Sequence, residues 1–293
     1  AIAIVAGFQG FNTDSRDITT LGRGGSDTTA VALAAVLGAE VCEIYTDVDG
    51  VFTADPRVVP RAQKLAAATY EEMLELAAAG AKVINIRAVE FARRHGVTLH
   101  VRSSFTQDVG TFISKEHGGE AVEEPIIAGV AGDTSEAKIT VVGVPDIPGK
   151  AAEIFTIVAG AGANIDMIVQ NVSVHEAGRT DISFTLPIED GERTMQALED
   201  AREESGFESL IYDDEIGRLS VVGAGMRTNA GVSAQLFTAL SGAGINIEMI
   251  STSEIRISVI MRSDILPDAV RAVHRAFGLD GDVDATVYAG TGR

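Results

Sequence analysis

Apolar and polar positions in the first third of the chain form two kinds of segment. Short continuous apolar runs are typical of strands buried on both faces, and Ala- and Leu-rich runs that begin after Gly, Ser or Asp are typical of helices. The pattern predicts strands at 1–6, 40–46 and 98–103 and helices at 26–37, 70–79 and 88–95. Strands joined by helical crossovers indicate an α/β domain with a largely parallel sheet covered on both faces.

The remainder of the chain contains an internal repeat. Residues 139–168 and 219–250 share apolar, glycine and asparagine positions in the same order, from a Val-Val-Gly triplet to an Asn-Ile pair. After a two-residue insertion in the second copy, Gly149 aligns with Gly231. A match that runs in order through about thirty residues marks a duplicated structural unit.

Each copy is predicted to fold as a βαββαβ unit, the ferredoxin-like pattern. The expected elements lie at 139–144, 149–160, 165–172, 180–186, 191–204 and 208–212 in the first copy, and at 218–223, 231–242, 246–252, 255–261, 264–276 and 283–288 in the second. A stretch at 114–125 contains Gly, charges and Pro without apolar periodicity, which is typical of a domain boundary. We therefore expect domains at 1–124, 125–215 and 216–293.

The charge balance narrows the possible partners. Asp and Glu number 42 and Lys and Arg number 23, which gives a formal net charge of -19. A chain this acidic repels phosphate backbones and anionic lipid, so we expect neither nucleic acid nor a membrane as partner. A single cysteine, Cys42, excludes an internal disulfide, and no apolar run is long enough to span a bilayer, so a cytoplasmic location is expected.

The segment LGRGGSDTT at 21–29 opens a predicted helix. Glycines before a helix let the backbone approach an anion, and the free N–H groups of the first turn point towards that anion. Arg23 adds a guanidinium that can hold a carboxylate or a phosphate through two hydrogen bonds. The alternative is a glycine-rich turn capped by Ser26 or Asp27. An arginine between glycines is unusual for capping alone, so the sequence favours an anion site.

The segment TDVDGVFTADPR at 46–57 follows a predicted strand. Ligands of open α/β sheets bind outside the carboxyl ends of the strands, where these acidic residues can hold a ribose or a metal. A calcium-like loop or a solvated turn is the alternative, although the complete EF-hand spacing is absent. Arg57 is a second candidate phosphate ligand. Lys82 follows the helix predicted at 70–79, whose C-terminal dipole favours a cation, and this position alone favours a structural role. The five histidines show no metal-ligand spacing, so no metal held by protein ligands is expected.

Together these motifs resemble those of the aspartate kinases of the monofunctional type. The tandem units carry NID and NIE and end in STSEIRIS and VYAGTGR, and they follow LGRGGSDTTA, YTDVDGVFTADPR and a downstream GAK. The resemblance covers essentially the whole chain and implies an amino-acid-kinase (carbamate-kinase-like) domain followed by two ACT domains. It implies ATP-dependent phosphorylation of L-aspartate to 4-phospho-L-aspartate, the first step of lysine, threonine, methionine and diaminopimelate synthesis.

The resemblance also assigns roles to residues of the first domain. Arg23 and Asp27 are the implied catalytic residues, because Arg23 would bind an aspartate carboxylate and Asp27 would organise the transfer centre. The aspartate pocket would be lined by Arg23, Gly24, Gly25 and Ser26. The nucleotide would be bound by Thr46, Asp47, Phe52, Asp55, Arg57 and Lys82. Mg²⁺ would accompany ATP, held largely by phosphates and water.

The ACT repeats imply feedback inhibition by lysine, threonine or both, and a homodimer paired through the ACT domains. The implied effector ligands are Asp146, Gly149, Asn164, Ile165, Asp166 and Gln170 in the first repeat and Gly231, Val232, Asn246, Ile247 and Thr252 in the second. Alternatively, the two asparagines only cap turns after the glycines that precede them. Duplication of the whole Gly-x-Asn-Ile feature favours binding.

One motif of the family is missing from the sequence. Aspartate kinases open with Lys-Phe-Gly-Gly, whose lysine neutralises the transferring phosphoryl group, and this chain contains no such motif. The chain therefore resembles an aspartate kinase without its N-terminal part, and we expect little or no activity from the chain alone. Two other functions remain open: a non-catalytic regulatory module that binds amino acids, and a kinase of glutamate or a nucleotide, which the tandem ACT region disfavours.

Overall fold

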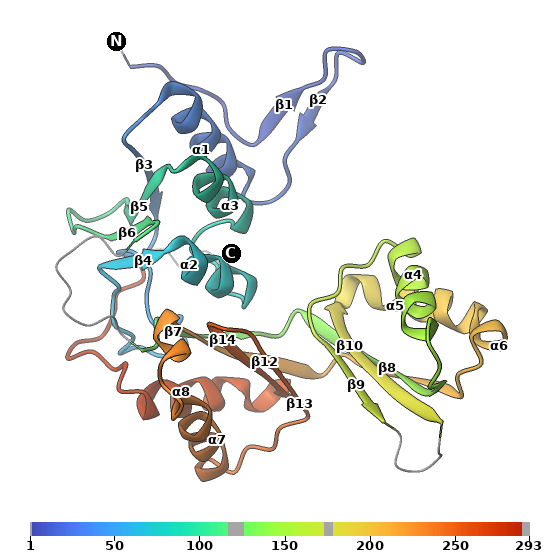
Figure 1. Cartoon of the computed structure of the whole chain (residues 1–293). Helices are drawn as coiled ribbons and strands as arrows, with labels where there is room; N and C mark the ends of the chain where they lie inside the picture. Colours follow the sequence, from blue (N-terminus) through green and yellow to red (C-terminus); the bar gives the residue numbers. More distant parts are fainter. Residues whose placement is uncertain (1, 117–125, 173–177, 289–293) are drawn as a thin grey trace.

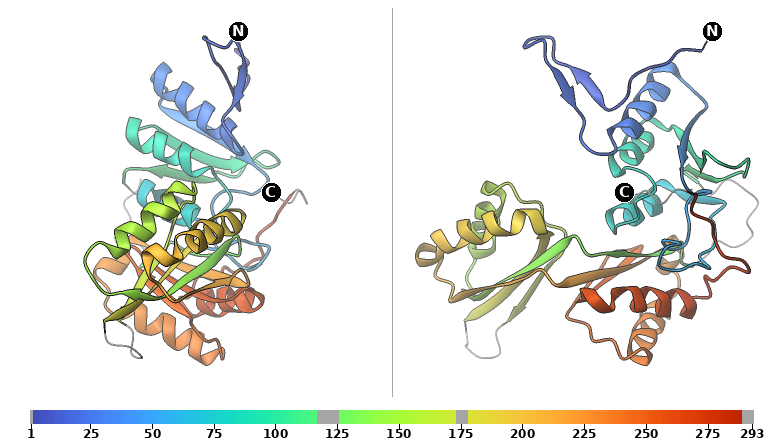
Figure 2. Two further views of the ribbon diagram at one scale, coloured as in Figure 1. Left: turned by 90° about the vertical axis from the view of Figure 1, so that its right-hand side faces the viewer. Right: turned by 180° about the vertical axis from the view of Figure 1, so that it is seen from behind.

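The computed structural model describes residues 2–116, 126–172 and 178–288. An α/β part made by the N-terminal third stacks on the second repeat domain, and the first repeat domain extends to one side (Figures 1 and 2). Most of the predicted boundary stretch at 114–125 lies outside the described residues, as does the end of the chain at 289–293.

The α/β part contains three helices and a four-stranded sheet. Its elements are a hairpin of β1 (Gln9–Phe11) and β2 (Ile18–Thr20), then α1 (Gly25–Leu37), β3 (Val41–Thr46), β4 (Ala67–Thr69), α2 (Tyr70–Ala78), α3 (Ile86–His95), β5 (Thr98–Ser103) and β6 (Thr111–Ser114). The strand order is β3-β5-β6-β4. The pairs β3–β5 and β4–β6 are parallel and β5–β6 is antiparallel. The α/β class is confirmed, but the sheet is mixed, because the short β5–β6 connection permits only antiparallel pairing.

The strand predicted at 1–6 is wrong. Residues 2–6 are largely exposed and form no strand within the part of the chain that the structure describes. An apolar run becomes a strand only where a neighbouring strand pairs its N–H and C=O groups. The other five predicted elements of this part are confirmed to within two residues at each end, whereas the short strands β4 and β6 were not predicted.

Local signals set where the helices begin and end. α1 follows Gly24, which has a left-handed φ of 75°, and ends at Gly38, which has a φ of 64°. α2 begins with a capping box: the Thr69 hydroxyl accepts from the Glu72 N–H, and the Glu72 carboxylate accepts from the Thr69 N–H. Asn85 caps α3 through its side-chain oxygen. These are the residue types that helix ends favour.

The first repeat folds as predicted, as a βαββαβ unit. It consists of β8 (Glu136–Pro145), α4 (Lys150–Gly160), β9 (Ile168–Val172), β10 (Arg179–Pro187), α5 (Ile188–Asp200), a short α6 (Arg202–Ser205) and β11 (Ser209–Asp213). The antiparallel sheet has the order β11-β8-β10-β9. Side chains of α4, including Ile154 and Val158, are fully buried against the sheet residues Ile139 and Phe184.

The second repeat has two helices that correspond to α4 and α5, but a different fourth strand. Its own elements are β12 (Ile216–Val222), the 3-10 turn η1 (Ala224–Arg227), α7 (Val232–Gly242), β13 (Met249–Thr252), β14 (Arg256–Arg262), the 3-10 turn η2 (Ser263–Ile265) and α8 (Leu266–Ala276). The sheet order is β13-β14-β12-β7, and β7 (Gly129–Asp133) precedes the first repeat in sequence. The strand predicted at 283–288 is wrong, because β7 occupies the edge of β12. The range 125–215 therefore includes a strand of the second sheet.

The second repeat shares its core with the α/β part. Every residue of β12 is buried, since α7 and α8 cover one face of the sheet and α2 lies against the other (Figure 1). Ala131 and Val222 join the core around Met73 and Leu76 of α2. The first repeat has its own core and meets the second through a small cluster around Met167. None of the described helices is long and apolar enough to cross a membrane.

Candidate functional site

Helices α1 and α3 begin side by side. The Asn85 side chain donates a hydrogen bond from Nδ2 to the Arg23 carbonyl at 3.0 Å, and the Asn85 N–H donates to Asp27 Oδ2 at 3.3 Å. The same side chain accepts from the Arg87 N–H at 2.9 Å through Oδ1. Asn85 thus fixes the start of α3 to the start of α1. Two helix N-termini, each carrying a partial positive charge, lie next to one another.

Two glycines permit this close approach. Gly24 has a left-handed φ of 75°, and a Cβ at this position would lie 2.5 Å from Asn85 Nδ2. Gly25 is buried, and a Cβ there would lie 2.7 Å from Leu21 Cβ. A side chain at Gly24 would therefore both strain the backbone and displace the asparagine that joins the two helices.

The structure brings the residues at 23–27 together at this helix start. Arg23 and Ser26 are exposed, and Asp27 is half-buried with its carboxylate held by the α3 segment. Lys82 is exposed and lies three residues before Asn85, the residue that contacts Asp27. Burial, and then the Asp27 charge, raise the pKa of the Cys42 thiol. Cys42 therefore remains a protonated thiol at neutral pH, as expected for an inert buried cysteine.

The segment after β3 forms a second polar cluster. The Thr46 hydroxyl is buried and donates to Asp47 Oδ1 at 3.1 Å. The Arg57 guanidinium lies 3.5 Å from Asp47 Oδ2, and the Arg57 N–H donates to Asp55 Oδ1 at 2.9 Å. The structure therefore gathers four of the expected nucleotide ligands into one cluster. Phe52 differs, since it is half-buried against the core of the second repeat.

Several contacts of these two clusters were not predicted from the sequence. Asn85 carries a local signal, an asparagine before an amphipathic helix, but the helix was predicted to begin two residues too late. The bonds from Thr53 to His274 and from Asp49 to Tyr288 join residues more than 200 positions apart, so no local pattern reveals them. Among the described residues, no group of three or more His, Cys, Asp and Glu side chains is placed to hold a metal ion.

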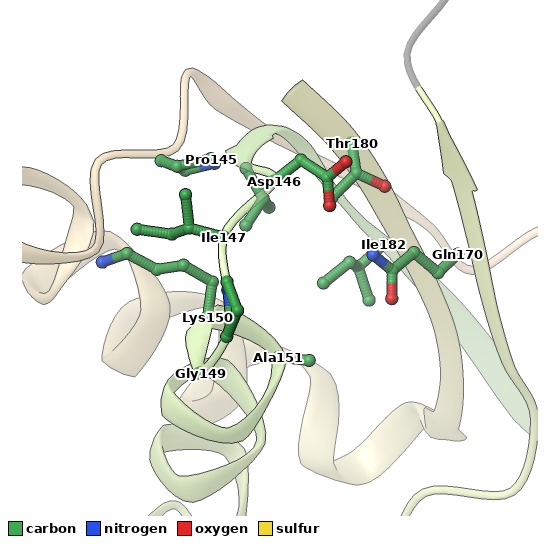
Figure 3. Close-up of a pocket in the computed structure, with 11 residues that line it drawn as sticks. Pro145, Asp146, Ile147, Gly149, Lys150, Ala151, Gln170, Thr180 and Ile182 are labelled. Atoms are coloured by element: carbon green, nitrogen blue, oxygen red, sulfur yellow. The ribbon is translucent and has the colours of Figure 1, made fainter. Parts of the chain in front are cut away.

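A pocket of about 340 Å³ opens in the first repeat at the start of α4 (Figure 3). It is lined by Val144, Pro145, Asp146, Ile147, Pro148, Gly149, Lys150, Ala151, Gln170, Thr180 and Ile182. Gly149 has a left-handed φ of 102° and precedes the first turn of α4. In Figure 3 the Asp146 carboxylate lies beside the Thr180 hydroxyl, and the Gln170 amide lies beside Ile182. The structure thus brings Asp146, Gly149 and Gln170 together.

The other expected effector ligands of the first repeat lie outside this pocket. Asn164 is exposed, and Ile165 packs against the core of its own domain. Asp166 contacts Arg218 and lies 3.7 Å from Arg256, both on strands of the second repeat. Asp166 therefore belongs to a junction between domains, because buried arginines need carboxylate partners.

The expected ligands of the second repeat are also dispersed. Gly231, Asn246 and Thr252 are exposed, whereas Val232 is buried and Ile247 is half-buried in the core beneath α7. None of these five residues lines the pocket of Figure 3. Gly231 has a φ of -82°, so the second repeat does not reproduce the left-handed glycine that precedes α4.

Comparisons with known proteins divide the chain in the same way. The model of the amino acid kinase family matches residues 1–103. The model of the ACT domain matches residues 139–201 and 219–277, one match for each repeat.

Two relatives in sequence are described as aspartokinases. The aspartokinase of Mycobacterium tuberculosis is 58% identical over 292 residues, which cover 100% of this chain and 69% of that protein. The aspartokinase of Corynebacterium glutamicum is 56% identical with the same coverage. Among solved structures, Clostridium acetobutylicum aspartate kinase aligns with a TM-score of 0.79 at 26% identity, over 92% of this chain and 62% of that one.

A second solved structure, E. coli aspartokinase III in complex with aspartate and ADP, aligns with a TM-score of 0.78 at 26% identity, over 92% of this chain and 59% of that one. The chain thus spans about two thirds of the length of its relatives. An identity above half over the whole chain, together with matched kinase and ACT segments in the same order, shows that the chain belongs to the aspartokinase family.

Proposed function

We propose that this chain supplies part of the catalytic site and the regulatory domains of an aspartate kinase. A β-carboxylate oxygen of L-aspartate attacks the γ-phosphorus of ATP, the bond from phosphorus to ADP breaks, and ADP leaves with the electron pair, which yields 4-phospho-L-aspartate. The observation that carries the proposal is the pair of helix N-termini joined through Asn85, with Arg23 beside them. Adjacent helix starts and a guanidinium favour the binding of anions.

The residues at this helix start suit an amino-acid substrate with two carboxylates. The exposed Arg23 guanidinium can hold one carboxylate through two parallel hydrogen bonds. Gly24, Gly25 and Ser26 offer backbone N–H groups without side-chain bulk, as an anion at a helix start requires. Asp27, fixed by the Asn85 N–H, is the group placed to orient the aspartate relative to the transferring phosphoryl group.

The nucleotide is assigned to the cluster after β3. Thr46, Asp47 and Asp55 supply hydroxyl and carboxylate groups, and Arg57 and the exposed Lys82 supply positive charge for phosphates. Phe52 contributes by packing the segment onto the second repeat. Mg²⁺ would accompany ATP as part of the nucleotide substrate, held largely by phosphates and water.

The test is formation of the acyl phosphate by the full-length gene product, trapped with hydroxylamine as the hydroxamate. Replacing Arg23 by Ala should raise the KM for aspartate by roughly 10- to 100-fold, the range of a charged hydrogen-bonded contact, and leave the KM for ATP nearly unchanged. Arg23→Lys should recover only part of this loss, because an ammonium cannot form the paired bonds.

Arg94→Ala is the matched control, since Arg94 is an exposed arginine in the last turn of α3, away from the helix start. A wild-type protein that forms no hydroxamate, yet binds lysine or threonine, would instead support a non-catalytic regulatory subunit. Equal effects of Arg23→Ala and Arg94→Ala on the KM for aspartate would show that Arg23 does not bind the aspartate substrate.

We propose that the pocket of Figure 3 binds the inhibitory amino acid, with lysine and threonine as the candidates. A structure of E. coli aspartokinase III is described as a complex with lysine and aspartate, in the T-state. Here the Asp146 carboxylate can pair with an ammonium group, while backbone N–H groups at the start of α4 can donate hydrogen bonds to a carboxylate. We also propose a homodimer paired through the ACT domains, because Ile168 and Ile211 on the sheet edges are more than half exposed.

Calorimetry tests the effector pocket. Asp146→Asn keeps the size of the side chain and removes its charge, so affinity for the effector should fall by roughly tenfold or more. Glu189→Gln, an equal change at an exposed position in the first turn of α5, should leave affinity unaltered. Unchanged affinity in Asp146→Asn would place the amino acid elsewhere, for example around Asn246 in the second repeat.

A further inference from the structure

The chain returns from the second repeat to the α/β part after α8. Residues 279–288, here called the C-terminal strap, run from the end of α8 along the polar cluster that follows β3 (Figure 2). Three backbone N–H groups of the strap donate to the cluster or its flank: Gly281 to Arg61 O at 2.6 Å, Ala285 to Pro60 O at 2.7 Å and Tyr288 to Asp47 O at 3.0 Å. Val287 also forms a β-bridge with Val48. Residues 283–288 of the strap are the segment that was predicted to complete the second sheet.

The strap is anchored at its beginning by His274, which is fully buried in α8. His274 Nδ1 lies 3.0 Å from the Asp280 carboxylate, and Nε2 lies 2.8 Å from the Thr53 hydroxyl. A carboxylate only accepts hydrogen bonds, so Nδ1 carries the proton and Nε2 accepts from Thr53. The same hydroxyl accepts from the Gln63 N–H at 3.0 Å. Residues on both sides of Arg57 are thereby tied to the second ACT domain.

The strap is anchored at its other end by Tyr288. Its hydroxyl donates to Asp49 Oδ2 at 3.2 Å, and its ring stacks on Phe105 with a centroid distance of 5.8 Å. The Thr106 hydroxyl donates to the other oxygen of the same carboxylate at 2.7 Å. Asp49 is buried and therefore needs both donors. One tyrosine thus links the strap to the segments that follow β3 and β5.

The geometry points to the C-terminal strap as a positioning element for the nucleotide, with Tyr288 as its key residue: by holding Asp47 and Asp49 it sets the backbone that presents the Thr46, Asp47 and Arg57 side chains. This inference rests on the proposed function, since the nucleotide role of residues 46–57 belongs to that proposal. Tyr288 is a positioning residue because it acts through Asp49. The strap also joins the second ACT domain to the nucleotide cluster through its backbone hydrogen bonds and Tyr288.

The test separates positioning from folding. Tyr288→Phe removes only the bond to Asp49, and Tyr288→Ala also removes the contact with Phe105. In the full-length gene product we expect the KM for ATP to rise roughly threefold to tenfold in Tyr288→Phe, the value of one hydrogen bond, and further in Tyr288→Ala. The KM for aspartate and the melting temperature should stay near wild type. Tyr212→Phe makes the same change on β11 of the first repeat and serves as control.

Hydrogen exchange provides a readout that does not depend on catalysis. Amides at 47–51 should exchange faster in Tyr288→Phe than in Tyr212→Phe. Faster exchange with an unchanged KM for ATP, or no change in either, would overturn the inference. If the wild type forms no acyl phosphate, the proposed function fails on its own, and the strap is then judged by ATP affinity in calorimetry: a loss in Tyr288→Phe supports it, and equal affinities or no ATP binding overturn it.

Discussion

At the scale of single residues, His274 shows how hydrogen bonds to both ring nitrogens offset the cost of burying a polar side chain. Burial lowers the pKa of its imidazole, and the nearby Asp280 only partly opposes that effect. In the neutral ring both nitrogens form hydrogen bonds: one donates to Asp280 and the other accepts from Thr53. Protonation would place a second proton against the Thr53 hydroxyl and a charge in the core, so burial favours the neutral form of the ring.

The free energy of unfolding should therefore depend on pH near this histidine. With a folded-state pKa below the unfolded value of about 6.5, the unfolded chain binds more protons as pH falls. The contribution of His274 to the free energy of unfolding is therefore complete above pH 6.5. Below that pH the free energy of unfolding declines, by at most about 1.4 kcal/mol per pH unit for one proton. Urea denaturation from pH 7.5 to 5 measures the slope.

His274→Gln should flatten this dependence, since glutamine does not titrate. The control is His95→Gln, which removes an exposed histidine at the end of α3 and should keep the wild-type slope. If His274→Gln and the wild type lose stability in parallel between pH 6.5 and 5, the assignment of a neutral buried ring is wrong.

At the scale of elements, the sequence pattern predicted the features that depend on neighbouring residues, namely where helices begin and which strand residues are buried. α1 and both repeat helices α4 and α7 follow glycines that the sequence displays, and alternating burial in β8 and β10 appears directly as apolar periodicity. The helix starts of the candidate site were predicted for the same reason, because Arg23 and its glycines form a contiguous motif.

Pairing between distant segments escaped prediction. The edge of β12, where a strand was predicted at 283–288, is occupied by β7, and both segments contain apolar residues. β7 pairs there through five residues from Gly129 to Asp133, while the strap pairs with the α/β part at single bridges. A strand pattern specifies that a segment is extended but not which neighbour it joins, so neither the exchange nor the contacts of Tyr288 could be read from the sequence.

At the scale of the whole molecule, Arg218 joins three parts of the chain. Its guanidinium, almost fully buried on β12, donates to the Ala78 carbonyl at the end of α2 at 2.7 Å and lies 3.4 Å from Asp133 of β7. It also lies 3.1 Å from Glu136 of the first repeat and contacts Asp166 of the same repeat. A cation at a helix C-terminus is favourable in itself, and here it also offsets three carboxylates.

Removing this one side chain should weaken both the stability and the cooperativity of the protein. Arg218→Met retains much of the volume but leaves Asp133, Glu136 and Asp166 without their shared cation, which should cost about 3–5 kcal/mol. Arg262→Met is the matched control. Arg262 also joins the two repeats, through Asp213 on β11 and the neighbouring Glu215, but it lies at the partly exposed end of β14, so its loss should cost less than about 1 kcal/mol. Since Arg218 links the first repeat to the shared core of the other parts, its loss should also split the denaturant transition into two, with the first repeat and the shared core unfolding separately. A single transition with equal destabilisation in both variants would show that the apolar cluster around Met167, rather than Arg218, couples the domains.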